Sequence, residues 1–348
     1  MNIVTTDSQS ASSNCIANPA TSPSEGWKAS MRAAFRRASD LAEHLQLPES
    51  SWQTGLAAAD GFPLFVPREF AAKMRRGDIG DPLLRQVLPV EQETFVTESF
   101  TANPVGDDEA MLTPGLLQKY HGRALMVTTG ACAVHCRYCF RRHFPYGEGP
   151  KGIDAWSSAL GAIHQDESLH EILLSGGDPL TLTDGVLTLL AEKIAAARHI
   201  RRLRVHTRLP VMIPSRVCDS LLAWLTGTRL RPFVVIHVNH PHELADDVAA
   251  ALARLSEAQV PLLNQSVLLK GVNDDAETLI ELSEKLLDLN VMPYYLHQLD
   301  RVQGAAHFEV PRAEGLRIVK TMRSRLPGYA VPRYVEEIAG DASKRVIG

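Results

Sequence analysis

Cysteine, aromatic side chains and long apolar runs are all scarce in this sequence of 348 residues. It holds five cysteines and 6% aromatic residues, too few thiols for a small scaffold stabilised by disulfides. No stretch approaches the roughly 20 apolar residues of a membrane span, and the N-terminus lacks the basic start and apolar run of a secretory signal. A net charge of -4 gives no broad attraction to nucleic acid or to an anionic membrane. We therefore expect a cytoplasmic protein whose partners are neither nucleic acid nor membrane.

The first third of the chain predicts no regular α/β pattern. Residues 1–26 are rich in Ser, Asn, Thr and Ala without periodicity, so we expect them to be disordered. Apolar residues recur at helical spacing across residues 27–47. Several prolines interrupt residues 48–120. We therefore expect residues 27–120 to form a mostly helical N-terminal domain that covers another part of the molecule.

From residue 121 the pattern changes to short apolar runs that alternate with helical stretches. The predicted strands are 124–129, 171–175, 203–207, 233–238, 261–269 and 291–296, and the predicted helices include 184–198, 244–258, 274–288 and 311–325. This alternation is typical of consecutive βα units around a parallel sheet. The fold class is therefore α/β, a partial (β/α)6 TIM-type barrel over residues 121–327, followed by a short C-terminal segment, 328–348. Polar residues follow most strands, where the reactive face of such barrels lies.

Three of the five cysteines, Cys132, Cys136 and Cys139, fall within eight residues. Thiolates this close suit a soft metal centre, and three of them on a four-iron cluster leave one iron open to a ligand. The alternative is a Cys3His zinc site completed by His135 or His143. The C-x3-C-x2-C spacing resembles the signature of the radical S-adenosylmethionine (SAM) enzymes, which implies a partial barrel of the radical SAM type.

Two further segments are less specific when read from their residues alone. Gly176, Gly177 and Asp178 follow a predicted strand, where glycines permit close backbone approach and free amides can meet a charged group, although an ordinary strand-to-helix turn has the same composition. Lys344 lies in a short Gly/Ala/Ser-rich context that suits Schiff-base chemistry. A solvated lysine near the end of the sequence is the alternative.

From residue 120 to residue 344 the sequence resembles the lysine 2,3-aminomutases, and within them a short bacterial form that acts in modification of elongation factor P. The resemblance rests on CAVHCRYCFRRHFPY, LLSGGDPL, NQSVLLKGVND, MPYYLHQLDRVQGAAHF and GYAVP, with DPLLRQVL and PGLLQKYHGRAL upstream. It implies three cofactors: a [4Fe-4S] cluster, SAM and pyridoxal 5'-phosphate (PLP).

The resemblance also implies a role for each site residue. The metal ligands are the three clustered cysteines, Lys344 is the catalytic lysine that binds PLP covalently, and Tyr120 and Arg123 lie against PLP. The SAM contacts are Gly176, Gly177, Asp178, His237 and Gln265. The lysine substrate is held by Arg141 at its carboxylate and by Asp300 and Glu337 at its side-chain ammonium. Glu337 departs from the aspartate of the family pattern. Asp275 stands where longer relatives have a zinc-ligating cysteine, so no structural zinc is expected.

The implied activity is isomerisation of free L-lysine to (R)-β-lysine, with flavodoxin or ferredoxin as reductant and with the product passed to the lysine ligase of elongation factor P. Two alternatives stay open at this point: an iron-sulfur or zinc protein that only binds a partner, and a related radical aminomutase acting on glutamate or arginine. The oligomeric state is left open.

Overall fold

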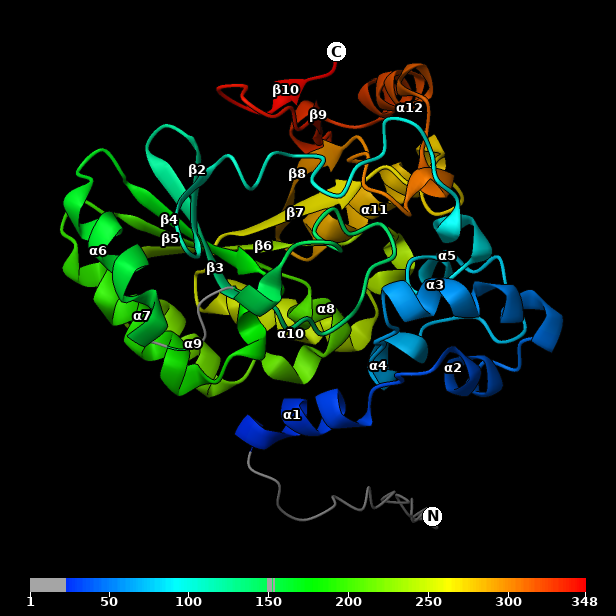
Figure 1. Cartoon of the computed structure of the whole chain (residues 1–348), viewed down its shortest axis with the longest axis horizontal. Helices are drawn as coiled ribbons and strands as arrows, with labels where there is room; N and C mark the ends of the chain where they lie inside the picture. Colours follow the sequence, from blue (N-terminus) through cyan, green and yellow to red (C-terminus); the bar gives the residue numbers. More distant parts are fainter. Residues whose placement is uncertain (1–22, 149–151, 153) are drawn as a thin grey trace, which may run out of the picture.

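One ten-stranded sheet, whose strands follow the order of the sequence, organises the chain (Figure 1). The computed structural model describes residues 23–148, 152 and 154–348. All six strands predicted from the sequence are confirmed, as β3 (Arg123–Thr129), β4 (Glu171–Gly176), β5 (Arg202–Thr207), β6 (Arg231–Ile236), β7 (Leu262–Val267) and β8 (Val291–His297). Each pairs in parallel with the next. The partial α/β barrel expected from the sequence is therefore confirmed.

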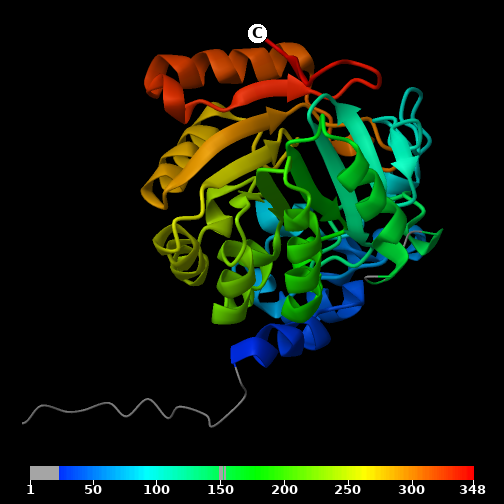
Figure 2. The ribbon, with the colours of Figure 1, turned by 90° about the vertical axis from the view of Figure 1, so that its left-hand side faces the viewer.

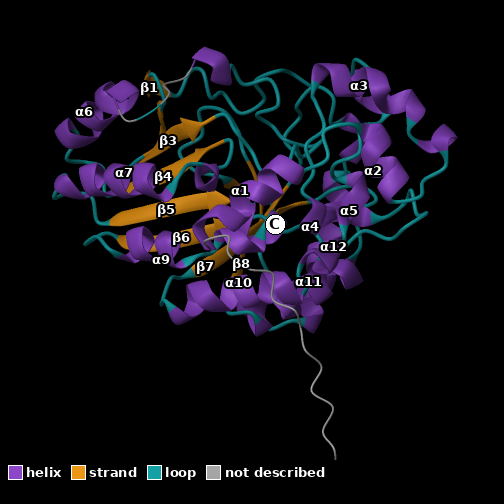
Figure 3. Cartoon of the chain, turned by 90° about the horizontal axis from the view of Figure 1, so that it is seen from below, coloured by secondary structure: helices purple, strands orange, loops and turns teal. Residues whose placement is uncertain are grey.

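The helices that connect the strands lie on the outer face of the curved sheet (Figures 2 and 3). They are α6 (Ser157–Gln165), α7 (Asp184–Ala196), α8 (Leu209–Met212), α9 (Asp219–Thr226), α10 (Asp246–Glu257), α11 (Ala276–Asp288) and α12 (Arg312–Arg325). In α11 the buried face includes Leu279, Leu282 and Leu286, and the Asp275 side chain caps its first turn by accepting from the amide of Thr278 at 2.9 Å. Helix α11 thus buries one apolar face against the sheet.

The two edges of the sheet extend beyond the predicted barrel. On one edge β1 (Met111–Thr113) and β2 (Leu116–Tyr120) continue the sheet antiparallel to β3. On the other edge β9 (Arg333–Glu336) adds a further parallel strand beside β8, and β10 (Arg345–Val346) pairs antiparallel with β9. The domain boundaries predicted at residues 120 and 327 therefore fall within one continuous hydrogen-bonded sheet. Strands this short owe their register to their neighbours, which the local sequence does not specify.

The N-terminal region is helical, as predicted, but its helices are shorter than expected. It contains α1 (Pro23–Ala33), α2 (Ala38–His44), α3 (Leu56–Gly61), α4 (Arg68–Ala71) and α5 (Pro82–Arg85). We expected residues 1–26 to be disordered, but α1 already begins at Pro23, so the prediction is wrong for residues 23–26. Residues 1–22 lie outside the described residues. The single helix expected over residues 27–47 is divided because Phe35 forms a β-bridge with Val66.

The N-terminal helices and the barrel share one hydrophobic core. Fully buried residues of the N-terminal region, among them Leu41, Phe70 and Leu83, belong to the same cluster as the sheet residues Leu174 and Ile236. None of the described helices is both long enough and apolar enough to cross a membrane. The N-terminal region also hydrogen-bonds to the loop after β3: the amides of His135 and Arg137 donate to the carbonyls of Phe65 and Gln86 at 3.0 and 2.9 Å. It therefore covers the carboxyl end of the barrel.

Candidate active site

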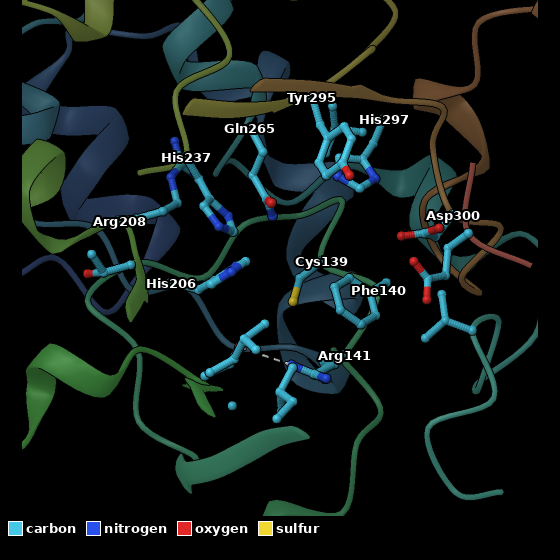
Figure 4. A pocket seen from close by; sticks show the side chains of 18 of the residues that line it. Cys139, Phe140, Arg141, His206, Arg208, His237, Gln265, Tyr295, His297 and Asp300 are labelled. Carbon is cyan, nitrogen blue, oxygen red and sulfur yellow. Dashed lines mark hydrogen bonds between the residues drawn. The ribbon is translucent and has the colours of Figure 1, made fainter. Parts of the chain in front are cut away.

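A cavity of about 910 Å³ runs through the concave side of the sheet (Figure 4). Every site residue singled out from the sequence lines it, namely Tyr120, Arg123, Cys132, Cys136, Cys139, Arg141, Gly176, Gly177, Asp178, His237, Gln265, Asp300, Glu337 and Lys344. Most of them follow the carboxyl ends of strands, as parallel barrels require. Tyr120 and Arg123 instead flank the turn between β2 and β3, at the amino end of β3, so the cavity extends along the interior of the barrel.

The three clustered cysteines lie on the loop between β3 and α6 and are only partly exposed. Burial, then the neighbouring thiols, raise the pKa of Cys132 well above its usual value, and burial followed by Cys136 raises the pKa of Cys139 to about 11. Cys132 and Cys139 therefore need a nearby cationic centre to become thiolates. This donor set fits an iron-sulfur cluster.

The spacing of these thiols does not suit a single ion. Among the described residues, no group of three His, Cys, Asp or Glu side chains is arranged to hold one metal ion. A four-iron cluster binds each thiolate at a different iron and therefore needs a wider spacing. His135 and His143, the candidate fourth ligands for zinc, direct ring nitrogens to the carbonyls of Pro63 and Gln303 at 2.7 and 3.1 Å. Each histidine keeps a second ring nitrogen, so these bonds do not decide against zinc; three thiolates without a fourth cysteine nearby favour the cluster.

The backbone amides at the end of β4 are bonded within the protein. We expected their free amides to meet a charged group, but the amides of Gly177 and Asp178 donate to the carbonyls of Thr129 and Ala131, both at 2.7 Å. A Cβ atom on Gly177 would lie 2.3 Å from the Ala131 carbonyl oxygen. The absence of a side chain therefore lets β4 hold the first residues of the cysteine loop. The prediction of free amides is wrong because their partners lie across the sheet.

The Asp178 carboxylate is also engaged within the protein. It accepts hydrogen bonds from the Thr207 hydroxyl at 2.7 Å and from the amides of Arg208, Leu209 and Leu180 at 2.7, 3.1 and 3.0 Å. Burial nevertheless raises the pKa of Asp178. Asp178 thus links the end of β4 to the end of β5, and it lines the cavity without directing a free oxygen into it.

Three imidazoles of the cavity wall each have a buried nitrogen without a partner among the described residues. The Nε2 atoms of His206, His237 and His297 have no partner in the described structure. Burial lowers the pKa of His237 to about 3 and holds the pKa values of the other two well below the usual range, so all three are neutral. Unpaired buried nitrogens are costly, and a polar ligand would satisfy them. With Gln265 between them in Figure 4, they form a cradle that fits a cofactor such as SAM.

Lys344 and Glu337 face each other across the turn between β9 and β10, where Arg345 pairs with Glu336. The Lys344 ammonium is hydrogen-bonded to Glu337 Oε2, and the Tyr120 hydroxyl donates to Glu337 Oε1 at 2.6 Å. Although burial opposes it, these two partners hold the pKa of Glu337 below its usual value. The Arg123 guanidinium lies 4.6 Å from the centre of the Tyr120 ring. An amine in a cavity, beside an aromatic ring and a guanidinium, fits an anionic carbonyl cofactor such as PLP.

Asp300 follows β8 and points into the same cavity (Figure 4). Burial raises its pKa to about 7, an effect that Lys344 opposes and Glu337 reinforces. Near neutral pH this carboxyl group is therefore balanced between its two protonation states. An added cation beside it would favour the charged form.

Arg141 is held by Asp107, a residue to which the sequence analysis gave no role. Its Nε donates to Asp107 Oδ2 at 2.6 Å, and its Nη1 lies 3.3 Å from the Ser175 hydroxyl. The Lys119 ammonium contacts the other oxygen of Asp107 at 2.8 Å. Burial alone would raise the pKa of Asp107, but the two cations hold it below its usual value. Asp107 lies in an irregular segment before β1, where no periodic pattern marked it.

Arg208 is a second residue to which sequence reasoning gave no role. It directly follows β5, where the sequence predicts only that polar residues come after the strand. Its Nη1 donates to Cys136 Sγ at 2.8 Å and to the Tyr138 hydroxyl at 2.9 Å. An arginine directly after a barrel strand was the only sequence signal for this contact.

Comparisons with known proteins agree with this geometry. Residues 126–283 match the Radical SAM superfamily. The L-lysine 2,3-aminomutase of Haemophilus influenzae is 43% identical over 326 residues, covering 94% of this chain and 96% of that protein. The protein of the same name from Escherichia coli is 45% identical over 85% of this chain and 86% of its own length. The one from Buchnera aphidicola is 38% identical over 92% and 94%.

Proposed function

This chain belongs to the L-lysine 2,3-aminomutase family of radical SAM enzymes, and we propose that it converts free L-lysine to (R)-β-lysine. It would do so by moving the α-amino group to the neighbouring carbon. The observation that carries this proposal is the single cavity that contains both the three-thiol loop and the Lys344 amine. A cluster site and a Schiff-base lysine within one cavity are what a radical enzyme that also uses PLP requires.

The family's cofactors are a [4Fe-4S] cluster, SAM and PLP. When bound, the cluster and SAM supply a carbon-centred radical, and PLP makes the amino group mobile. We assign the cluster to Cys132, Cys136 and Cys139. The unpaired His237 nitrogen and Gln265 support their assignment to SAM. The amine of Lys344, with Tyr120 and Arg123 beside it, supports the assignment of PLP to the β9–β10 turn.

We propose that the substrate lies between a cationic and an anionic group. The Arg141 guanidinium can hold a carboxylate through parallel hydrogen bonds, and Asp107 fixes its orientation from the opposite side. Asp300 and Glu337 supply two carboxylates that can hold the side-chain ammonium of lysine. A glutamate substrate would bring a third carboxylate to this end, and a buried charge without a partner costs about 3–5 kcal/mol. A protein that only binds a partner is also disfavoured, because a binding surface does not need charged groups of both signs inside a cavity.

The direct test uses the protein prepared without oxygen, with its cluster reconstituted and PLP added. Incubation with lysine, SAM and dithionite should give β-lysine, identified by chromatography and mass spectrometry. Lys344→Ala should abolish both the product and the absorbance band of the enzyme-bound PLP imine, while iron content stays unchanged. Iron and imine without any β-lysine would refute lysine as the substrate.

Three further proposals concern the setting of the reaction. We propose that flavodoxin or ferredoxin supplies the electron, that the product serves the lysine ligase of elongation factor P, and that the reaction occurs in the cytoplasm, where exposed thiols stay reduced. Deletion of the gene should remove the β-lysyl mass from elongation factor P, and added β-lysine should restore it. Normal elongation factor P in the deletion strain would refute the link without affecting the activity measured in vitro.

A further inference from the structure

Arg208 is the only residue among those described whose guanidinium donates to a sulfur of the cysteine loop. Its side chain is buried, and its backbone is fixed by the bond from its amide to the Asp178 carboxylate. The direction of Nη1 toward Cys136 Sγ therefore follows from the end of β5 and not from a mobile surface side chain. Figure 4 shows Arg208 on the same wall of the cavity as His237.

A buried carboxylate holds the other side of this guanidinium. Arg208 Nη2 lies 2.8 Å from Glu243 Oε2, and the Glu243 side chain is completely buried. Glu243 Oε1 accepts from the amides of Asn239 and His240 at 3.0 and 3.1 Å and from the Gln86 amide group at 3.0 Å. Glu243 is thus fixed by hydrogen bonds from two parts of the chain, and it fixes Arg208 in turn.

We propose that Arg208 is a positioning residue that raises the reduction potential of the cluster by donating a charged hydrogen bond to Cys136, and that Glu243 limits this effect. The inference rests on the proposed function, because it requires that the three cysteines hold an iron-sulfur cluster. A thiolate bound to iron keeps lone pairs that accept hydrogen bonds, and such bonds are among the features that set cluster potentials.

The expected direction of the shift in reduction potential follows from the charges of Arg208 and Glu243. Reduction adds one electron to the cluster and its thiolates, and a nearby cation stabilises that added negative charge in a buried site. Removing Arg208 should therefore make reduction harder and the potential more negative. Removing the Glu243 charge leaves the Arg208 cation uncompensated, so the potential should become more positive.

The experiment is a redox titration of the reconstituted protein with dithionite and mediators, without SAM or lysine, followed by electron paramagnetic resonance. Arg208→Gln should lower the one-electron reduction equilibrium constant about tenfold, which is about 59 mV. Arg208→Lys, which keeps the charge, should shift it less. Glu243→Gln should shift it in the opposite direction. Iron and sulfide contents confirm that each variant holds a complete cluster.

Arg216 provides a matched control. It too is completely buried and paired with a carboxylate, Asp184 at 2.7 Å, and its Nη1 lies 3.7 Å from a cysteine sulfur, that of Cys218, which is outside the cysteine loop. Arg216→Gln should lower the melting temperature and leave the potential unchanged. This separates loss of a buried ion pair from loss of the donor to the cluster.

Several outcomes would overturn the inference. An unchanged potential in Arg208→Gln with a complete cluster would do so, as would shifts of the same sign in Arg208→Gln and Glu243→Gln. In a separate SAM titration, a change in SAM affinity without any shift in potential would make Arg208 a cofactor contact instead. If Arg208→Gln holds no cluster, the test rests on Glu243→Gln. A more positive reduction potential in that variant supports the inference, and an unchanged or more negative one overturns it. Wild-type protein without any cluster would instead refute the proposed function itself.

Discussion

Asp300 and Glu337 face the same cavity but differ in charge. Glu337 has the Tyr120 hydroxyl and the Lys344 ammonium as partners, which hold its pKa below the usual range. Among the described residues no side chain donates a hydrogen bond to the Asp300 carboxylate, and burial raises its pKa to about 7. A substrate ammonium would supply the missing partner. Asp300 therefore titrates near neutral pH, while Glu337 stays charged.

This difference predicts how lysine binding depends on pH. Below pH 7 Asp300 is largely protonated and attracts an ammonium weakly, so lysine affinity should rise as the pH is raised from 6 to 8, by up to about tenfold per unit at the acidic end. Calorimetry with the PLP-loaded protein can measure it. Asp300→Asn should flatten the dependence. An equal slope in the variant would show that another group is responsible.

The same residue predicts a selective loss of activity. Asp300→Asn removes one of the two carboxylates while keeping the side-chain size, so turnover of lysine should fall about a hundredfold, consistent with the loss of a buried charge partner. Cluster and PLP contents should remain normal, as measured by iron analysis and absorbance. Full activity in this variant would remove Asp300 from the substrate site.

At the scale of elements, the turn after β4 determines where the cysteine loop begins. Because the Cβ of any residue at position 177 would overlap the Ala131 carbonyl, only glycine allows the two bonds between this turn and residues 129–131. The folding of β4 and the placement of the thiols are therefore coupled. The cysteines depend on a strand that is remote from them in sequence.

Gly177→Ala should consequently destabilise the protein by about 1–3 kcal/mol or more, since the clash is with backbone, and should lower the iron content after reconstitution. Gly185→Ala in α7 is the control, because a Cβ there meets no atom within 4 Å. Denaturant unfolding and iron analysis measure both effects. Normal iron binding by Gly177→Ala would show that the loop can form without this contact.

Periodicity and spacing in the sequence predicted the elements that form from a local pattern. They did not predict the elements and contacts that depend on residues distant in sequence. The six parallel strands and the helices α7, α10, α11 and α12 were predicted because their apolar patterns are long enough to stand out. Strands β9 and β10 were missed because Arg333–Glu336 and Arg345–Val346 gain their register from β8. The roles of Asp107 and Arg208 were missed for the same reason: each acts through a charged group that is remote in sequence.

At the scale of the whole molecule, a buried ion cluster connects the N-terminal region to the cysteine loop. The Glu93 carboxylate binds Arg137 at 2.6 Å and Arg142 at 2.8 Å, and these arginines flank Cys139 on either side. Arg137 also donates to the carbonyls of Phe62 and Ala58. Together with the shared hydrophobic core, this cluster makes the N-terminal region part of the barrel's folding unit.

Glu93→Gln should therefore cost about 3–5 kcal/mol, because it leaves two buried cations without their counter-charge. Thermal unfolding should remain a single transition at a lower temperature, and iron binding should weaken with it. Asp40→Asn is the control, since the Arg37–Asp40 pair is solvent-exposed and contributes little. Two separate transitions would show that the N-terminal region folds independently.

The late position of β10 in the chain has a consequence for biosynthesis. The thiol loop leaves the ribosome while most of the barrel is still to be made, whereas Lys344 emerges only with the β9–β10 hairpin. On the proposed assignments, metal capture can begin on a nascent polypeptide, whereas attachment of the vitamin-derived aldehyde to Lys344 must wait until the β9–β10 hairpin has been made. The maturation of the two centres is in this way ordered by the direction of protein synthesis.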